Sequence, residues 1–77
     1  MLPCPCCGHL TITRIGYFDL CPVCYWEDDY AQSQNPESPL GANGYSLVEA
    51  RLNFQKTGAS HPEFIGLVRP PTPLERN

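Results

Sequence analysis

The stretches Cys4-Pro5-Cys6-Cys7-Gly8 and Cys21-Pro22-Val23-Cys24 decide the fold of this 77-residue chain. Each contains a Cys-x-x-Cys pair, and the tight turn of such a pair, here called a knuckle, points two thiolates the same way. Proline sets φ for the turn, and Gly8 permits the positive φ with which the chain leaves the first knuckle. Two facing knuckles provide four soft ligands in a tetrahedron, which suits zinc. The predicted metal ligands are the four cysteines of the two Cys-x-x-Cys pairs: Cys4, Cys7, Cys21 and Cys24.

Cys6 lies inside the first knuckle and has no counterpart in the second. It can pack as a small apolar group, exchange with Cys4 as a ligand, or act as a reactive thiol near the metal. Cys4 and Cys7 reproduce the spacing of the second pair, whereas Cys6 and Cys7 do not, which favours packing for Cys6. His9 is interpreted as a strand residue, with metal binding as the alternative.

A metal closed in by four thiolates has no open position for a substrate or for water, so the predicted metal is structural and no residue is predicted to be catalytic. A core of this size rarely supplies more than about 3–5 kcal/mol, whereas a structural zinc adds about 10–16 kcal/mol. Disulfides and dithiol redox chemistry are the competing interpretations of the cysteines. The odd cysteine count, the lack of a signal-like N-terminal segment and the lack of a bilayer-long apolar run favour metal in a cytoplasmic protein.

The charge of the chain bears on its partners. The formal net charge is −3, and bound zinc with four thiolates would make it more negative. Proteins that grip phosphate backbones carry a basic face, and the basic residues here are scattered along the chain. They are Arg14, Arg51, Lys56, Arg69 and Arg76. We therefore expect a protein partner, not nucleic acid or a membrane.

We expect a single domain over residues 1–77 with a small α+β zinc-ribbon fold: a β-hairpin carrying both knuckles, one packed α-helix and a proline-rich tail. In the hairpin, residues 10–13 would pair with residues 17–20 across a turn at Gly16. Residues 64–68 are apolar enough to form an edge strand. The expected segments are a knuckle hairpin over 1–30, a loop over 31–45, a helix over 46–57 and an extended tail over 58–77.

The helix and the acidic run Glu27-Asp28-Asp29, here called the acidic block, are expected to meet. Ser46 and Glu49 form a capping-box pattern at the start of the helix, and Gly58 is a natural residue to follow its end. Arg51 lies on the apolar side of this helix, so we predict that it pairs with a carboxylate of the acidic block. The other interpretations of the block are a solvated face, a catalytic cluster and a second metal site. Trp26 is predicted to shield the metal from water.

Three separated motifs carry a resemblance to a known family. They are Pro3-Cys4-Pro5-Cys6-Cys7-Gly8, the stretch from Cys21 to Asp29 and the stretch from Gly41 to Phe54. Together they resemble the cysteine-rich CPCC domain family of small, mainly bacterial proteins, over roughly residues 3–60. The resemblance implies a metal-binding domain and no particular reaction. A looser resemblance, to rubredoxin, covers only the knuckles.

The function expected from these observations is that of a non-enzymatic, cytoplasmic protein-interaction module with a structural Zn²⁺. It would bind through an aromatic and acidic surface or through its tail. The alternatives are a rubredoxin-like electron carrier with iron in place of zinc, a nucleic-acid-binding zinc ribbon, and an enzyme that uses the acidic block with His61 or Asn43.

Overall fold

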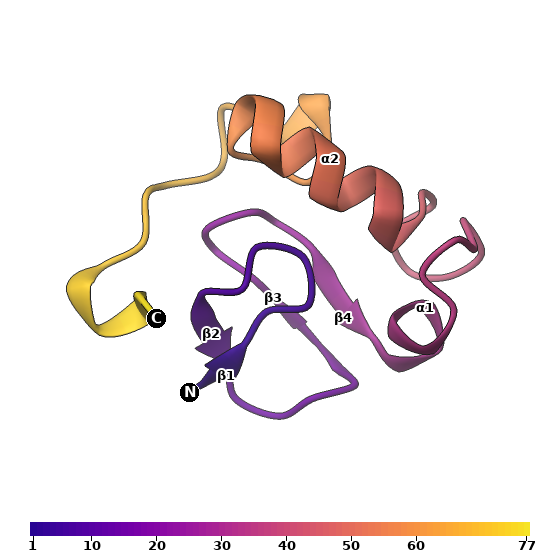
Figure 1. Cartoon of the computed structure of the whole chain (residues 1–77), viewed down its shortest axis with the longest axis horizontal. Coiled ribbons are helices and arrows are strands. Elements are labelled where there is room, and N and C mark those ends of the chain that lie inside the picture. Colours follow the sequence, from indigo (N-terminus) through magenta and orange to yellow (C-terminus); the bar gives the residue numbers. More distant parts are fainter.

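Two short antiparallel hairpins follow one another in the N-terminal part of the chain, in a computed structural model that describes residues 1–77. In the first hairpin β1 (Leu2–Pro3) pairs with β2 (Leu10–Ile12). In the second, β3 (Tyr17–Leu20) pairs with β4 (Glu27–Asp29). Each knuckle forms the loop of one hairpin, as Figure 1 shows. The protein is thus a small α+β molecule in which two equivalent loops present the cysteines.

The prediction of one hairpin carrying both knuckles is wrong, because residues 10–13 do not pair with residues 17–20. Each knuckle closes on itself through its own backbone hydrogen bonds, and this brings its two flanking segments together as a pair of strands. Residues 13–16 instead connect the two sheets. Gly16 has the predicted positive φ, 85°, and its N–H donates to Oδ2 of Asp28 at 2.6 Å.

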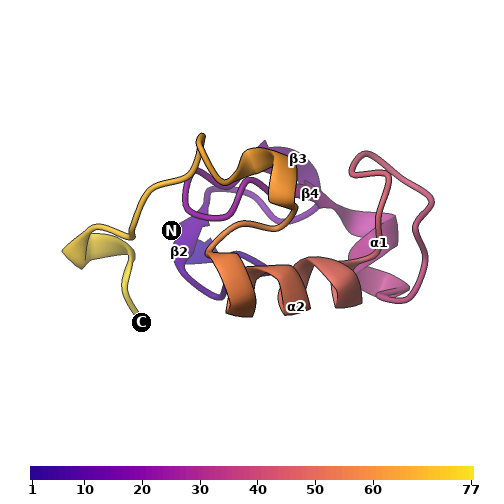
Figure 2. The ribbon, with the colours of Figure 1, turned by 90° about the horizontal axis from the view of Figure 1, so that it is seen from above.

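Helix α2 (Leu47–Thr57) lies across the hairpins (Figures 1 and 2). The Ser46 hydroxyl accepts a hydrogen bond from the N–H of Glu49 at 3.0 Å, which satisfies one of the free donors of the first turn. Gly58 ends the helix with φ 83° and donates to the carbonyl of Phe54. Leu47 and Ala50 are buried beneath the helix.

The segment between the hairpins and α2 is more ordered than the predicted loop. It begins with a short helix, α1 (Tyr30–Gln34), whose N-cap is Asp29. Gln32 on this helix is fully buried, and its Nε2 donates to the carbonyls of Ser38 and Tyr45 at 3.1 and 2.8 Å. One buried side chain therefore holds together the start, middle and end of the segment.

The tail contains two short 3-10 helices, η1 (Pro62–Phe64) and η2 (Pro73–Glu75). The edge strand predicted for residues 64–68 is wrong, since Phe64 ends η1 and a turn follows it. His61 causes this local winding by accepting the N–H of Glu63 on its Nδ1 at 3.1 Å. The C-terminus returns to the side of the molecule that holds the N-terminus, where the Asn77 amide donates to the carbonyl of Gly8 (Figure 1).

The core of the molecule is small and is built around sulfur. Only 16 of 77 residues are buried, and the cysteines belong to the same apolar cluster as the large side chains. The fully buried members that pack there include Ile12, Trp26 and Leu47. No helix in the structure is long and apolar enough to cross a bilayer, the longest having 11 residues.

Candidate metal centre

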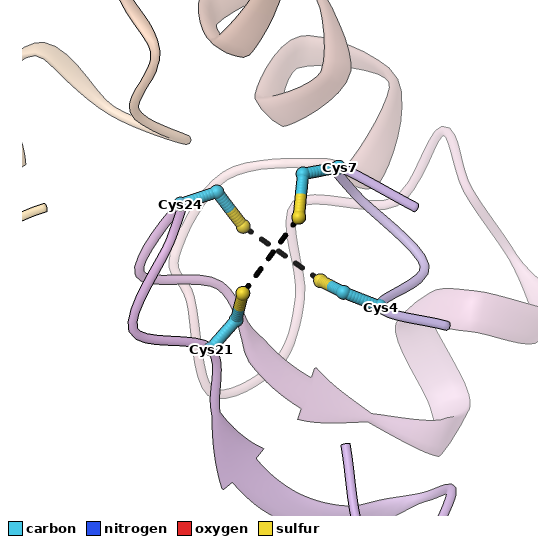
Figure 3. Close-up of side chains that lie close together, drawn as sticks. All are labelled: Cys4, Cys7, Cys21 and Cys24. Atoms are coloured by element: carbon cyan, nitrogen blue, oxygen red, sulfur yellow. Dashed lines mark hydrogen bonds between the residues drawn. The ribbon is translucent and has the colours of Figure 1, made fainter. Parts of the chain in front are cut away.

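The four cysteines predicted as ligands converge on one point from the two knuckles. Figure 3 shows the side chains of Cys4 and Cys7 facing those of Cys21 and Cys24. Their four Sγ atoms all lie within 4.8 Å of one another, and the Cys4–Cys24 and Cys7–Cys21 distances are both 3.7 Å. Four sulfurs around a tetrahedral zinc, each at about 2.3 Å from the ion, lie about 3.8 Å apart. The donor set and its spacing therefore fit a tetrathiolate metal.

Backbone hydrogen bonds shape the first knuckle. The carbonyl of Cys4 accepts the N–H of Gly8 at 2.8 Å, and the N–H of Cys4 donates to the carbonyl of His9 at 2.8 Å. These bonds satisfy the backbone on both sides of the loop. Gly8 has φ 80°, the conformation expected for it from the sequence.

The second knuckle repeats this pattern with different residues. Cys21 accepts the N–H of Tyr25 at 2.7 Å and donates to the carbonyl of Trp26 at 3.0 Å. Tyr25 therefore occupies the position of the glycine in the first knuckle and has φ 72°, a rare and strained conformation for a bulky residue. Sequence reasoning missed this strain, although superposing the two Cys-x-x-Cys motifs would have revealed it. Trp26 is fully buried in the cluster that contains the sulfurs and packs edge-on against Tyr45.

Hydrogen bonding sets the protonation of the four sulfurs when no cation is bound. The pKa of Cys21 is strongly lowered, because its sulfur accepts from the thiols of Cys24, Cys4 and Cys7, and from the Thr11 hydroxyl at 3.0 Å. The pKa values of the other three thiols are raised, chiefly by their bonds to the Cys21 thiolate and further by burial. A metal cation that converts the other three thiols to thiolates releases protons as it binds.

The family model for cysteine-rich CPCC proteins matches residues 2–75. The chain belongs to the cysteine-rich CPCC family. The match extends through the tail, beyond the three motifs that carry the resemblance in the sequence. No curated protein matches the sequence. Family membership and the four-sulfur cluster together indicate that this CPCC protein binds a metal.

Cys6 and His9 lie outside the four-sulfur group of this CPCC protein. Cys6 is buried, with 8% of its surface exposed, and belongs to the apolar core, in agreement with a packing role. His9 precedes β2 instead of lying in it, and its ring meets that of Phe54 edge-on at a centroid distance of 6.1 Å. Neither residue joins the predicted ligands.

Two residues of the acidic block are buried parts of the scaffold, so the interpretation of the block as a solvated face is wrong. Asp28 is fully buried, and Asp29 is 7% exposed. Asp28 accepts the N–H of Gly16. Asp29 accepts the N–H groups of Ala31 and Gln32 with Oδ1, which caps α1, and that of Ala42 with Oδ2. The partners of both carboxylates are neutral backbone donors, not cations, and Oδ1 of Asp28 is buried without a hydrogen bond.

The predicted pair between Arg51 and the acidic block is also wrong. Nε of Arg51 donates to the carbonyl of Pro5 at 3.0 Å, so the arginine docks α2 on the first knuckle. The ion pair of the structure joins Arg69 to Glu75 at 2.7 Å. Asp28 and Asp29 instead accept backbone N–H groups, and no carboxylate of the acidic block forms an ion pair with the arginine.

The acidic block does not assemble a second metal site. The four cysteines are the one group of three or more ligand-type side chains that lie close together. Asn43 is bonded through its side chain to the backbone of Glu27, and Nδ1 of His61 accepts a backbone N–H. The structure therefore assigns both residues to holding the chain in place.

Proposed function

We propose that this CPCC protein holds one structural zinc ion with the thiolates of its two knuckles, so that the hairpins and the ion form a zinc ribbon. The convergence of four sulfurs within 4.8 Å carries the proposal. Four thiolates leave zinc no open position, so the ion supplies folding energy and not catalysis. The small core supports this role, because only 16 of 77 residues are buried and their packing contributes little folding energy.

The metal content of the purified chain tests this part of the proposal. We expect one zinc per chain by elemental analysis, a colourless protein, and the intense charge-transfer and d–d absorption of a tetrahedral thiolate site when Co²⁺ replaces zinc. The same four sulfurs also suit iron. A red protein that bleaches on reduction would show that the bound metal is iron and that the domain is an electron carrier. A chain that binds neither metal stoichiometrically would overturn the proposal.

We also propose that the domain is a non-enzymatic module that binds another protein in the cytoplasm. Its net charge of −3 and its scattered basic residues argue against a nucleic-acid partner. Strand β3 offers apolar side chains to a partner, since Tyr17, Phe18 and Leu20 are 59%, 57% and 45% exposed. Thiolate ligands also fit a reducing compartment.

Affinity capture by the metal-loaded domain tests the partner. We expect a protein retained by the wild-type domain and lost with Phe18→Asn, a substitution that keeps the φ of 65° accessible. Leu40→Asn is the matched control, because Leu40 is 79% exposed and is not part of β3. Retention on heparin that falls steeply with salt would instead favour nucleic acid.

A further inference from the structure

A pocket of about 240 Å³ opens beside the second knuckle. Its walls come from the β3–β4 hairpin, the loop before α2 and η1. Three aromatic side chains and one carboxylate dominate the lining: Tyr25, Tyr45, Phe64 and Glu27. The pocket is separate from the four-sulfur cluster in its lining residues, and the proposed structural metal makes no use of it.

The aromatic rings of the pocket hold one another in place. The ring centroids of Tyr25 and Phe64 are 5.1 Å apart with a tilt of 45°. His61 packs behind them, at 4.9 Å from Tyr45 and 5.8 Å from Phe64. The Tyr45 hydroxyl is bonded to the Ser60 hydroxyl at 2.9 Å, which fixes this ring at its far end. The pocket therefore presents ring surfaces whose positions are set before any ligand arrives.

Tyr25 occupies a backbone position that favours glycine. Its φ of 72° matches the 80° of Gly8 at the equivalent place in the first knuckle, where glycine avoids the strain. A bulky residue in this conformation costs free energy, and such strain concentrates at binding sites. Glycine would adopt this backbone conformation with less strain. We therefore expect the tyrosine ring to have a role of its own.

Glu27 is the one member of the acidic block whose carboxylate has no partner. Asp28 and Asp29 are buried on backbone donors, whereas the Glu27 carboxylate makes neither an ion pair nor a hydrogen bond. Its backbone is clamped by Asn43, whose Oδ1 accepts the Glu27 N–H and whose Nδ2 donates to the Glu27 carbonyl, both at 2.9 Å. The half-buried side chain is thereby held at the pocket wall with its charge uncompensated.

We infer that this pocket binds the side chain of a lysine from the partner protein, an inference that rests on the protein-binding function proposed above. The ammonium group would pair with the Glu27 carboxylate, and the aliphatic stem would lie against the rings of Tyr25, Tyr45 and Phe64. Ring faces and a carboxylate together attract a cation that carries an apolar stem. The acidic net charge of the chain favours the approach of such a ligand.

NMR titration of the full metal-loaded chain with Nα-acetyl-lysine N-methylamide tests the inference. We expect saturable shifts of the Tyr25, Tyr45 and Phe64 ring signals, with a dissociation constant on the order of 1 mM for so small a ligand. The Glu27→Gln substitution should weaken binding about fivefold, as the loss of a partly exposed charge pair does. Glu37→Gln is the matched control, because it changes the net charge equally in an exposed loop, and it should leave the affinity unchanged.

The norleucine counterpart of this ligand has a similar aliphatic stem and no charge, so it separates recognition of lysine from general apolar binding. We expect no saturable shifts with it. Equal binding of both ligands, an equal loss of affinity in Glu27→Gln and Glu37→Gln, or no saturable shift with the lysine ligand would each overturn the inference.

Failure of the lysine pocket is distinguishable from failure of the protein-binding function. If a partner protein is captured equally by the wild type and by Glu27→Gln, the protein-binding function stands and the lysine pocket is wrong. If the lysine ligand binds as described but no partner is captured, the pocket stands and the protein-binding function is wrong.

Discussion

The side-chain amide of Asn43 forms two hydrogen bonds with the backbone of Glu27, one with its N–H and one with its carbonyl, both at 2.9 Å. A neighbouring strand would satisfy the same two groups in the same way. The Asn43 Nδ2 also donates to Oε1 of the buried Gln32 at 2.8 Å. One side chain thus joins β4, α1 and the loop before α2.

We expect Asn43→Ala to lower the free energy of unfolding by about 2–3 kcal/mol, because it removes hydrogen bonds and leaves the partly buried backbone groups of Glu27 and the Gln32 side chain unpaired. Chemical denaturation of the metal-loaded protein measures this. The control is Asn35→Ala, since Asn35 is exposed and makes no side-chain hydrogen bond, and its effect should stay within about 0.5 kcal/mol. Equal effects would show that the amide does not hold the segment.

The parts of the fold that depend on neighbours in the sequence could be predicted. The cysteine spacing indicated which four sulfurs meet, because each knuckle fixes its own two. Ser46 and Gly58 marked the ends of α2 through capping interactions within a few residues. In each case the deciding contacts lie inside one turn of chain.

The parts that depend on which segments pair or pack together could not be predicted. Residues 10–12 and 17–20 have the alternating pattern of a hairpin, but the pattern does not say which segment each one pairs with. The acidic block looks like a solvated run, and only the approach of Gly16 and Ala42 reveals why Asp28 and Asp29 are buried. Glu27 differs from its two neighbours only through these contacts, which engage the carboxylates of Asp28 and Asp29 and leave that of Glu27 without a partner.

Gly41 is required by the close approach of its loop to α1. A Cβ atom at this position would lie 2.6 Å from Oδ2 of Asp29 and 2.7 Å from the side chain of Gln32. We expect Gly41→Ala to lower the free energy of unfolding by about 2 kcal/mol or more, since both neighbours are buried and bonded. The control is Gly66→Ala, where the Cβ would meet nothing within 4 Å, and thermal unfolding should show little change. Similar losses in both variants would contradict the steric explanation.

Thr11 forms a hydrogen bond with one of the four converging sulfurs. Its hydroxyl donates to the Cys21 sulfur at 3.0 Å from a buried position on β2. We expect Thr11→Val to keep the shape of the side chain and to weaken zinc binding about tenfold, as the loss of other hydrogen bonds to metal ligands does. Competition with a chromophoric chelator measures the affinity. Thr13→Val removes a hydroxyl that bonds Asp19 on the surface, and it should leave the zinc affinity unchanged.

Arg69 holds Glu75 in its ionised form. Its guanidinium lowers the pKa of the Glu75 carboxyl from the usual 4.5 to about 2, with help from the Thr72 N–H. Because the folded-state pKa is depressed, this contact stabilises the tail fully above about pH 4.5 and is lost as the pH falls toward 2. Carbon-13 NMR of the carboxyl group should therefore show Glu75 ionised at pH 4. Arg69→Gln should raise its pKa toward 4.5, whereas Arg76→Gln should not.

The five cysteines should separate into four ligands and one packing residue. Cys21→Ser removes a sulfur of the converging group, so we expect the variant to lose the stoichiometric metal and much of its folded structure, because three thiolates hold a structural zinc poorly. Cys6→Ser removes a buried thiol from outside that group and should retain one metal per chain with a modest loss of stability. Each variant lacks a single thiol, so a general effect of lower cysteine content would appear in both. Elemental analysis and native mass spectrometry give the metal stoichiometry, and loss of the metal from Cys6→Ser would place Cys6 among the ligands.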